Sequence, residues 1–287
     1  MSDAEIAEHR GLIERLFPSL QLSTFRPIGE GWTVFTYEVN GDTIVQLPRS
    51  SYAAERLRAQ IAVLPELARE LPVPVPVPLL ASDDPPAIVY RKLDGVPFPE
   101  ASDGPWPERL GRAVQDLHAV APEFVGLRAT SADAVMDAFA DRLAVIADLA
   151  FPLLEPVLRD RLARRFDRYT THPEHRRFGP CVTHGDLAPE HVLVGPDGEL
   201  AGVLDWEELA VDDPVLDLAW LLHARPADGE RVLAAYGGAP DGTFRDRAAF
   251  RYVLMPFHDV LHGLDTGEER WIAEGLEGIR AREAAVP

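Results

Sequence analysis

The sequence is poor in the features that mark disulfide-bonded, zinc-clustered and membrane-spanning proteins. Its 287 residues include one cysteine, Cys181, which excludes both an internal disulfide and a zinc site built from several cysteines. No apolar run approaches the ~18 residues that a membrane-crossing helix needs. The amino terminus is acidic and has no basic segment followed by an apolar one, so we expect a soluble, cytoplasmic protein that does not associate with membranes.

Basic residues are scarce, and lysine is almost absent. The chain has 47 acidic residues against 28 basic ones, a formal net charge of −19, and its one lysine is Lys92. Leu93 follows Lys92, which excludes the phosphate loop of nucleotide hydrolases with its Gly-Lys-Ser/Thr ending. Such an acidic chain is a poor partner for nucleic acid and a natural partner for cations, whether metal ions or positively charged small molecules.

The residues that are present divide the chain into two parts. Hydrophobic residues make up 46% of the sequence, which is enough for a substantial core. Residues 1–93 contain strand-forming runs and the hairpin signal Asn40-Gly41, whereas residues 94–287 are mostly helical apart from a strand-and-turn block at 181–205. We therefore expect an α+β protein with a small sheet-rich unit, 1–93, and a larger helical unit, 94–287.

The periodicity of apolar residues also predicts individual elements. In the first part we expect helices at 3–17 and 51–70, strands between about 24 and 48, and a strand at 87–93. In the second part the predicted helices are roughly 105–119, 131–149, 153–170, 214–224, 227–236, 244–262 and 267–283.

Acidic charge is concentrated in the helical part. Residues 1–93 carry a net charge of −3 and residues 94–287 carry −16. Between Arg177 and Arg225 there is no Lys or Arg, although this interval holds ten acidic residues. A solvated acidic face is the usual explanation of such a run. Here several of the acids alternate with apolar residues in a strand-turn-strand context, which favours a functional site.

The strand-and-turn block carries the residues that suggest chemistry. Asp186 opens a loop in His184-Gly-Asp-Leu-Ala-Pro-Glu-His191, and Asp205 closes the next strand. A hairpin would place His191 beside Asp205, with Asp186 nearby. Two metal-capable groups around one carboxylate are the layout that phosphoryl transfer needs. The metal neutralises the phosphates, and the carboxylate orients the incoming hydroxyl and can accept its proton.

This block resembles the aminoglycoside phosphotransferase family, the antibiotic kinases with a protein-kinase-like fold. The resemblance rests on His-Gly-Asp, a histidine five residues after that aspartate, the later Leu-Asp-Trp, and Asp-Pro-Val-Leu-Asp-Leu at 213–218. It is nearest to the aminoglycoside 2″-phosphotransferase and macrolide phosphotransferase branches. The resemblance implies a bilobal fold, with 1–93 as the nucleotide-binding lobe and 94–287 as the helical lobe with the catalytic loop and substrate site.

The resemblance also implies a role for each of these residues. Asp186 matches the catalytic aspartate, Asp205 matches the aspartate that holds Mg²⁺, and His191 occupies the second metal-ligand position. His184 and Asp217 match structural residues that support the catalytic loop. ATP or GTP would be the phosphoryl donor, and Mg²⁺ the cofactor.

Residues of the sheet-rich part resemble the nucleotide site of the family. Gly29 and Gly31 lie in Ile28-Gly-Glu-Gly-Trp-Thr33, like the family's nucleotide-covering loop, although Gly-x-Gly alone also fits an ordinary turn. The backbone from about Tyr90 to Lys92 lies where the interlobe hinge would meet the purine.

The ion pair that the family carries at this site is replaced by two amides. The strand at 43–48, where the family has Lys or Arg, has Gln46, and the following helix has Gln60 in place of Glu. Losing both charges leaves no uncompensated charge and can keep a hydrogen bond, so the pair looks jointly replaced. Arg49 is the nearest replacement cation, though a regular strand would point it away from the face of Gln46.

Most of the residues that match the family's acceptor site are acidic. In the family the acceptor lies against acids near the catalytic loop and on the last helices, and the matching candidates here are Glu190, Glu207, Asp259, Glu268 and Trp271. An exposed acidic helix face with a core tryptophan explains the last three equally well. Together with the acidic interval before Arg225, these residues favour a polycationic acceptor.

We therefore expect an antibiotic kinase that transfers the γ-phosphoryl group of ATP or GTP to a hydroxyl of a cationic antibiotic, first an aminoglycoside, with resistance by inactivation. We expect a monomer. Alternatives are a kinase of macrolides, of basic peptide antibiotics or of another small hydroxyl compound. A nucleotide-binding pseudokinase is the non-enzyme alternative, motivated by Gln46 and Gln60. The presence of both Asp186 and Asp205 argues against it.

Overall fold

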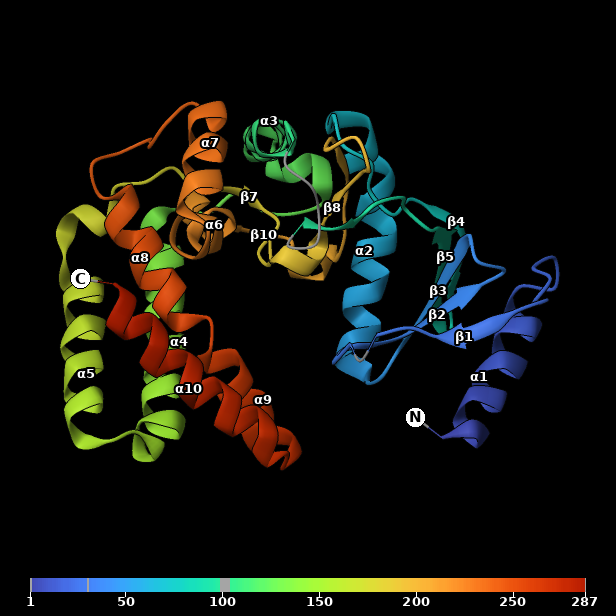
Figure 1. Ribbon diagram of the computed structural model, residues 1–287, viewed down its shortest axis with the longest axis horizontal. Helices are drawn as coiled ribbons and strands as arrows, with labels where there is room; N and C mark the ends of the chain where they lie inside the picture. Colours follow the sequence, from blue (N-terminus) through green and yellow to red (C-terminus); the bar gives the residue numbers. More distant parts are fainter. Residues whose placement is uncertain (1, 30, 99–103, 287) are drawn as a thin grey trace. The chain divides into compact units, whose positions relative to one another are not determined.

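The computed structural model describes residues 2–29, 31–98 and 104–286, which form two compact units (Figure 1). The first unit is Met1–Trp106 with Pro189–Glu208, and the second is Pro107–Ala188 with Leu209–Pro287. None of the helices formed by the described residues combines the length and the apolar character that a membrane crossing requires.

This division differs from the boundary at residue 93 that the sequence suggested. Strand β6 (Val96–Pro97) pairs with β8 (Val192–Val194), and β8 pairs with β9 (Leu200–Val203). The pairing ties the 189–208 segment to the sheet-rich unit, although this segment lies within the part, 94–287, that was predicted to be the helical unit. The boundary was missed because a two-residue strand leaves no signal in the apolar pattern.

A five-stranded antiparallel sheet forms the centre of the first unit, with the strand order β1-β2-β3-β5-β4. Its strands are β1 (Phe25–Pro27), β2 (Val34–Val39), β3 (Thr43–Pro48), β4 (Pro78–Asp83) and β5 (Pro86–Arg91). Asn40 and Gly41 join β2 to β3 with φ angles of 55° and 84°. Positive φ at both central residues is typical of the predicted hairpin turn, which is therefore confirmed. Strand β4 was not predicted from the sequence.

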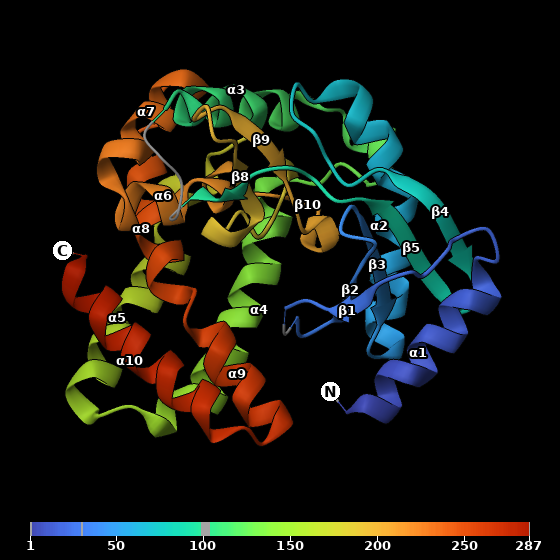
Figure 2. The same ribbon diagram turned by 45° about the vertical axis from the view of Figure 1, so that its right-hand side comes forward.

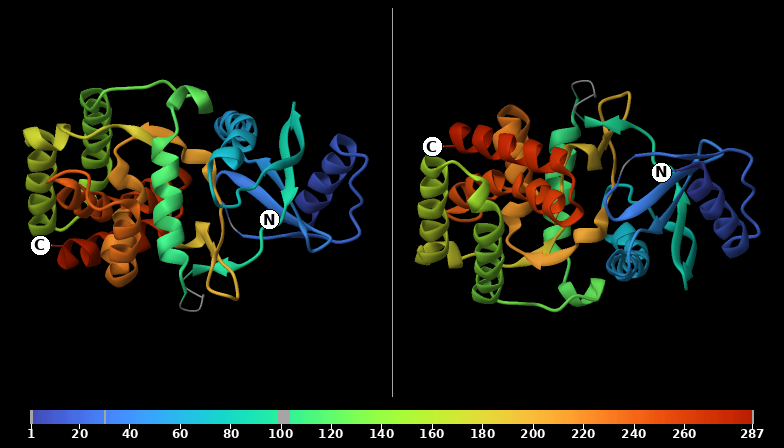
Figure 3. Two further views of the ribbon diagram at one scale, coloured as in Figure 1. Left: turned by 90° about the horizontal axis from the view of Figure 1, so that it is seen from above. Right: turned by 90° about the horizontal axis from the view of Figure 1, so that it is seen from below.

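Two helices cover opposite faces of this sheet (Figure 3). Helix α1 (Asp3–Leu16) packs Ile13 into a core with Tyr37 and Val45. Helix α2 (Ser51–Glu70) contacts β3, β4 and β5. Since side chains alternate along a strand, Gln46 lies on the face opposite to Val45, which is the face that α2 covers.

The second unit is mainly helical, as predicted (Figure 2). Its short strands β7 (Cys181–Thr183) and β10 (Ala210–Asp212) pair with each other. Its helices are α3 (Trp106–Ala119), α4 (Ala132–Ala150), α5 (Pro156–Thr171), α6 (Ala219–Ala224), α7 (Pro226–Tyr236), α8 (Phe244–Leu254), α9 (Phe257–Thr266) and α10 (Glu269–Ala285). Short 3₁₀ segments include η2 (Pro122–Val125), η3 (Phe151–Leu153), η4 (Pro173–Arg176) and η7 (Pro214–Asp217).

Two helix predictions in this unit are wrong. The helix expected at 214–224 is the 3₁₀ segment η7 followed by the short helix α6. The single helix expected at 244–262 is two helices, α8 and α9, which are separated at Met255 and Pro256. Proline lacks the N–H that would continue the hydrogen-bond ladder, so the helix ends before it. The apolar periodicity carries on across the break, which is why the pattern alone suggested one helix.

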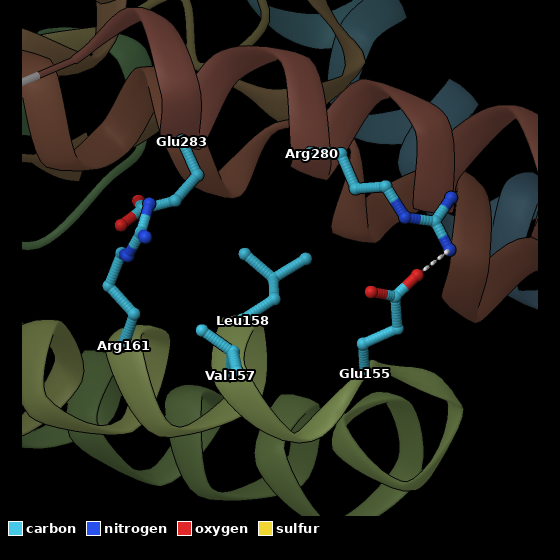
Figure 4. A pocket seen from close by; sticks show the side chains of 6 residues that line it. All are labelled: Glu155, Val157, Leu158, Arg161, Arg280 and Glu283. Atoms are coloured by element: carbon cyan, nitrogen blue, oxygen red, sulfur yellow. Dashed lines mark ion pairs between the residues drawn. The ribbon is translucent and has the colours of Figure 1, made fainter.

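A cavity of about 180 Å³ lies between α5 and α10 (Figure 4). Two acidic residues, Glu155 and Glu283, line it, and each is paired with an arginine: Glu155 with Arg280 at 3.9 Å, and Glu283 with Arg165 at 2.9 Å. None of the predicted site residues lines this cavity.

Candidate active site

In the second unit, β7 leads directly into the turn His184-Gly185-Asp186. The buried carboxylate of Asp217 accepts the backbone N–H of His184 at 2.8 Å and that of Gly185 at 2.9 Å. The N–H of Asp186 in turn donates to Nδ1 of His184 at 3.3 Å. Gly185 has a φ angle of 87°, which residues with a Cβ rarely adopt. These contacts fix the backbone on which the exposed Asp186 stands.

Asp217 is ionised although it is almost completely buried. Its exposed fraction is 1%. Burial alone would raise its pKa, but the hydrogen bonds from His118 and from the N–H of Gly185 outweigh that effect and hold the pKa below its ordinary value. Asp217 thus binds the backbone of the turn as a charged acceptor.

In the first unit, the β8–β9 hairpin brings His191 and Asp205 together. The N–H of Leu204 donates to the carbonyl of His191 at 2.8 Å, and Nε2 of His191 lies 3.4 Å from Oδ2 of Asp205. Asp205 has a φ angle of 62°, a left-handed conformation that is uncommon outside glycine. This strained residue keeps 42% of its side chain exposed, so its carboxylate is accessible.

Asp205 and His191 fit a Mg²⁺ site in which water and phosphate oxygens supply the remaining ligands. Among the described residues there is no cluster of three or more His, Cys, Asp and Glu side chains able to hold a metal. Mg²⁺ usually binds proteins through one or two carboxylates and takes its other ligands from water and substrate phosphates. The accessible carboxylate of Asp205, with His191 beside it, meets that description.

Glu207 is held within the first unit by a residue of the glycine-containing loop. The hydroxyl of Thr33 donates to Oε1 of Glu207 at 3.0 Å. Burial, together with the negative charge of Asp205, raises the pKa of Glu207 to about 7. Arg56 on α2 donates to the carbonyl of Glu207 at 2.6 Å and to the carboxylate of Glu208 at 2.8 Å. These contacts anchor η6 (Trp206–Glu208), the turn directly after Asp205.

The remaining predicted nucleotide residues also lie in the first unit. Gly29 has a φ angle of 73°, and Gly31 follows in the same loop. The guanidinium of Arg49 lies 4.0 Å above the ring of Phe35, so this cation packs on an aromatic face. Tyr90 is buried in β5, and the ammonium of Lys92 pairs with Glu38.

The predicted acceptor residues are divided between the units. Glu190 is exposed in η5 (Pro189–His191) of the first unit, as part of the segment that carries His191. In the second unit, Glu268 pairs with Arg270 at 3.1 Å, and that guanidinium lies 4.7 Å from the ring of Trp271. Burial raises the pKa of Asp259 on α9.

A comparison with protein families decides the class of this protein. Residues 24–252 match a family described as the phosphotransferase enzyme family, and the match spans both the glycine-containing loop and the turn at Asp186. The chain belongs to the phosphotransferase enzyme family. The predicted enzyme class and the resemblance are therefore confirmed, and the sites assigned within the phosphotransferase stay predictions.

Proteins that match this phosphotransferase over nearly its whole length are described with different antibiotics. Viomycin phosphotransferase of Streptomyces vinaceus is 29% identical over 96% of this chain and 99% of its own. The GDP and kanamycin complex of APH(2″)-IIIa has a TM-score of 0.85 and 27% identity, covering 96% of this chain and 98% of that one. Macrolide 2′-phosphotransferase MphH of Brachybacterium faecium has a TM-score of 0.75 and 28% identity, covering 97% and 98%. These similarities confirm the α+β kinase-like fold.

Two contacts in the phosphotransferase involve residues that sequence reasoning missed. Arg56 anchors the turn after Asp205, and His118 contacts Asp217. Arg56 had a signal, because it lies four residues before Gln60 and therefore on the same face of α2. His118 had none, because it lies 99 residues before Asp217.

We expect the thiol of Cys181 to be inert in the folded phosphotransferase. Burial, together with the nearby carboxylates of Asp217, Asp213 and Asp212, raises its pKa far above the ordinary value, and the thiolate is the reactive form. At pH 8, iodoacetamide should label the native protein at least about tenfold more slowly than the urea-unfolded chain. Equal labelling rates in the two states would contradict this assignment.

Proposed function

We propose that this phosphotransferase moves the γ-phosphoryl group of ATP or GTP to a hydroxyl of a polycationic antibiotic, with an aminoglycoside as the first candidate. The observation that carries the proposal is the presentation of Asp186. This exposed carboxylate stands on a turn whose backbone is bound by the buried Asp217. A fixed carboxylate can orient an acceptor hydroxyl and accept its proton, which are the tasks that phosphoryl transfer gives to the protein.

The proposed reaction makes one bond and breaks one. The acceptor oxygen bonds to the γ-phosphorus, the bond from that phosphorus to the bridging oxygen breaks, and the hydroxyl proton passes to Asp186. We assign Asp205 and His191 as the protein ligands of Mg²⁺, on the basis of their contact in the first unit. When bound, Mg²⁺ would neutralise charge on the phosphate oxygens.

The nucleotide-binding roles follow the family pattern. We assign Gly29 and Gly31 to the loop that covers the phosphates and the backbone near Tyr90 and Lys92 to the purine. Gln46 or Arg49 would contact the phosphates. Arg49 keeps its charge while packing on Phe35, and Gln46 offers an amide on the face of the sheet that α2 covers.

Charge supports a polycationic acceptor. No Lys or Arg occurs between Arg177 and Arg225, and ten acids do. We assign Asp259, Glu268 and Trp271 in the second unit to the acceptor site, with Glu190 and Glu207 as further acidic candidates. A macrolide carries about one amine, so this acidity favours macrolides less than aminoglycosides.

A basic peptide antibiotic is the second candidate. Viomycin phosphotransferase matches 96% of the length of this chain, which is a specific reason to keep basic peptide antibiotics as candidate acceptors. The acidic segments suit a basic peptide as well as an aminoglycoside, because both acceptors carry several positive charges.

The test is an acceptor panel with ATP and with GTP in the presence of Mg²⁺. We expect kcat/KM for aminoglycosides or basic peptides to exceed that for macrolides by at least about tenfold, which corresponds to ~1.4 kcal/mol of transition-state discrimination. Preference for a neutral hydroxyl compound would overturn the cationic acceptor. Nucleotide binding without turnover on any acceptor would favour the pseudokinase.

The two amides of the nucleotide site give a further prediction. Gln60 is 7% exposed on α2, and Gln46 lies on the face of the sheet that α2 covers. Gln46→Lys would place an ammonium there without a carboxylate partner, so we expect nucleotide affinity to fall by about threefold to tenfold. Titration calorimetry with ATP and GTP measures the effect.

The matched control restores the charge partner. The double variant Gln46→Lys/Gln60→Glu should bind nucleotide more tightly than Gln46→Lys alone, because the ammonium regains a carboxylate. If Gln46→Lys alone tightens nucleotide binding instead, the idea of a joint replacement fails.

A further inference from the structure

A buried hydrogen-bond chain in the second unit ends at the turn that presents Asp186. Nε2 of His118 on α3 lies 3.0 Å from Oδ2 of Asp217, and Nδ1 of His118 lies 2.9 Å from the hydroxyl of Tyr236 on α7. The same Asp217 carboxylate accepts the N–H groups of His184 and Gly185. The chain thus links α7 through His118 on α3 to the Asp217 carboxylate, and that carboxylate to the turn.

The contacts define which ring nitrogen carries the hydrogen. An ionised carboxylate only accepts, so Nε2 of His118 donates to Asp217. Nδ1 of His118 shares a second hydrogen bond, at 2.9 Å, with the phenol oxygen of Tyr236. The His118 side chain is 5% exposed and that of Asp217 is 0% exposed, so water does not compete for these bonds. Hydrogen bonds to a buried charged acceptor are among the strong ones.

We propose that His118 is a positioning residue for phosphoryl transfer: it fixes the orientation of the Asp217 carboxylate and thereby the turn that carries Asp186. This inference rests on the proposed catalytic role of Asp186. Asp217 receives three of its hydrogen bonds from His118, His184 and Gly185. Without the imidazole donor, Oδ2 of Asp217 keeps the N–H of His184 but loses its side-chain partner, so the turn is held less firmly.

Tyr236 supports the imidazole from the other side. Its ring meets that of His118 edge-on, with the centroids 5.4 Å apart. Packing and hydrogen bonding therefore both hold the histidine. A role in packing alone predicts lost stability when His118 is replaced, whereas a positioning role also predicts a lower kcat with unchanged substrate affinity.

The experiment compares two replacements of His118 with a control histidine. His118→Leu removes the donor and keeps an apolar body, and His118→Gln keeps an N–H that can reach Asp217. His175 is the control, since it is 6% exposed in the same unit and takes no part in the hydrogen bonds at Asp217. Its Nδ1 lies 3.0 Å from the carbonyl of Tyr169. Each variant is measured for kcat, for KM of nucleotide and acceptor, and for Tm.

We expect His118→Leu to lower kcat by about 10- to 100-fold while both KM values stay within about twofold. His118→Gln should recover most of that loss, and His175→Leu should lower Tm without lowering kcat. An unchanged kcat in His118→Leu would overturn the proposal. The proposal would also be overturned if His118→Gln did not recover the lost kcat, or if His175→Leu lowered kcat by the same factor.

A second readout separates this inference from the proposed function. Hydrogen exchange at the amides of His184 and Gly185 reports the bonds to Asp217 without any turnover. These amides should exchange faster in His118→Leu than in the wild type or in His175→Leu. If the wild type phosphorylates no acceptor, the proposed function fails, and exchange still decides whether His118 fixes the turn. Unchanged exchange would overturn that role.

Discussion

Replacing Asp186 with asparagine should lower kcat for phosphoryl transfer by about 10²- to 10⁴-fold, the range that a positioned proton acceptor contributes. Asparagine has nearly the same shape but cannot accept the hydroxyl proton. The backbone of the turn is bound through His184, Gly185 and Asp217, so the fold should not depend on the Asp186 carboxylate. Nucleotide affinity and Tm should therefore stay close to wild type. Steady-state kinetics, calorimetry and thermal unfolding check the three parts.

Asp148→Asn is a matched control for this prediction. Asp148 is exposed on α4, and its replacement removes the same charge from a position that no proposed role uses. It should leave kcat within about twofold, because surface substitutions away from special features have small effects. Full activity in Asp186→Asn would show that Asp186 is not the proton acceptor.

Replacing Arg247 with methionine should lower the free energy of unfolding by about 3–5 kcal/mol. The guanidinium is fully buried and binds both oxygens of Asp213, at 2.7 Å and 3.1 Å. It also donates to Asp241 at 2.8 Å. Methionine keeps much of the apolar stem but leaves Asp213 as a buried charge without its main partner. Urea unfolding measures the loss.

Arg245, on the same helix, provides the control. It pairs with Glu230, and both side chains are more than half exposed. Arg245→Met should change the free energy of unfolding by no more than about 1 kcal/mol, because exposed ion pairs contribute little. A similar small change in Arg247→Met would show that the buried pair does not hold α8 to the segment at Asp213.

The contact between two of the proposed site residues could be predicted because they are close together in sequence. Asp186, His191 and Asp205 occupy one strand-turn-strand segment, and the structure confirms the predicted contact of His191 with Asp205. The hairpin turn at Asn40-Gly41 could also be predicted, since it needs positive φ at two residues and Asn and Gly adopt positive φ readily. Local patterns of this kind depend on a few neighbouring residues.

The supporting residues could not be predicted because their partners are distant in the chain. His118 reaches Asp217 across 99 residues, and Arg247 reaches Asp213 across 34. Nothing in the spacing of a helix indicates which buried carboxylate its histidine will meet. For the same reason the sequence did not predict that 189–208 belongs to the first unit. That assignment depends on the pairing of β8 with the two-residue strand β6.

The most direct test of the proposed function is mass spectrometry of the acceptor after reaction with the wild-type phosphotransferase, Mg²⁺ and either ATP or GTP. Kanamycin and viomycin are the acceptors to use first, because one protein similar to this chain forms a complex with kanamycin and another is named viomycin phosphotransferase. We predict that at least one of the two gains a single phosphoryl group over many turnovers, and that Asp186→Asn forms almost none of this product. The contrary result is that neither antibiotic, nor any other cationic acceptor, is phosphorylated with either nucleotide.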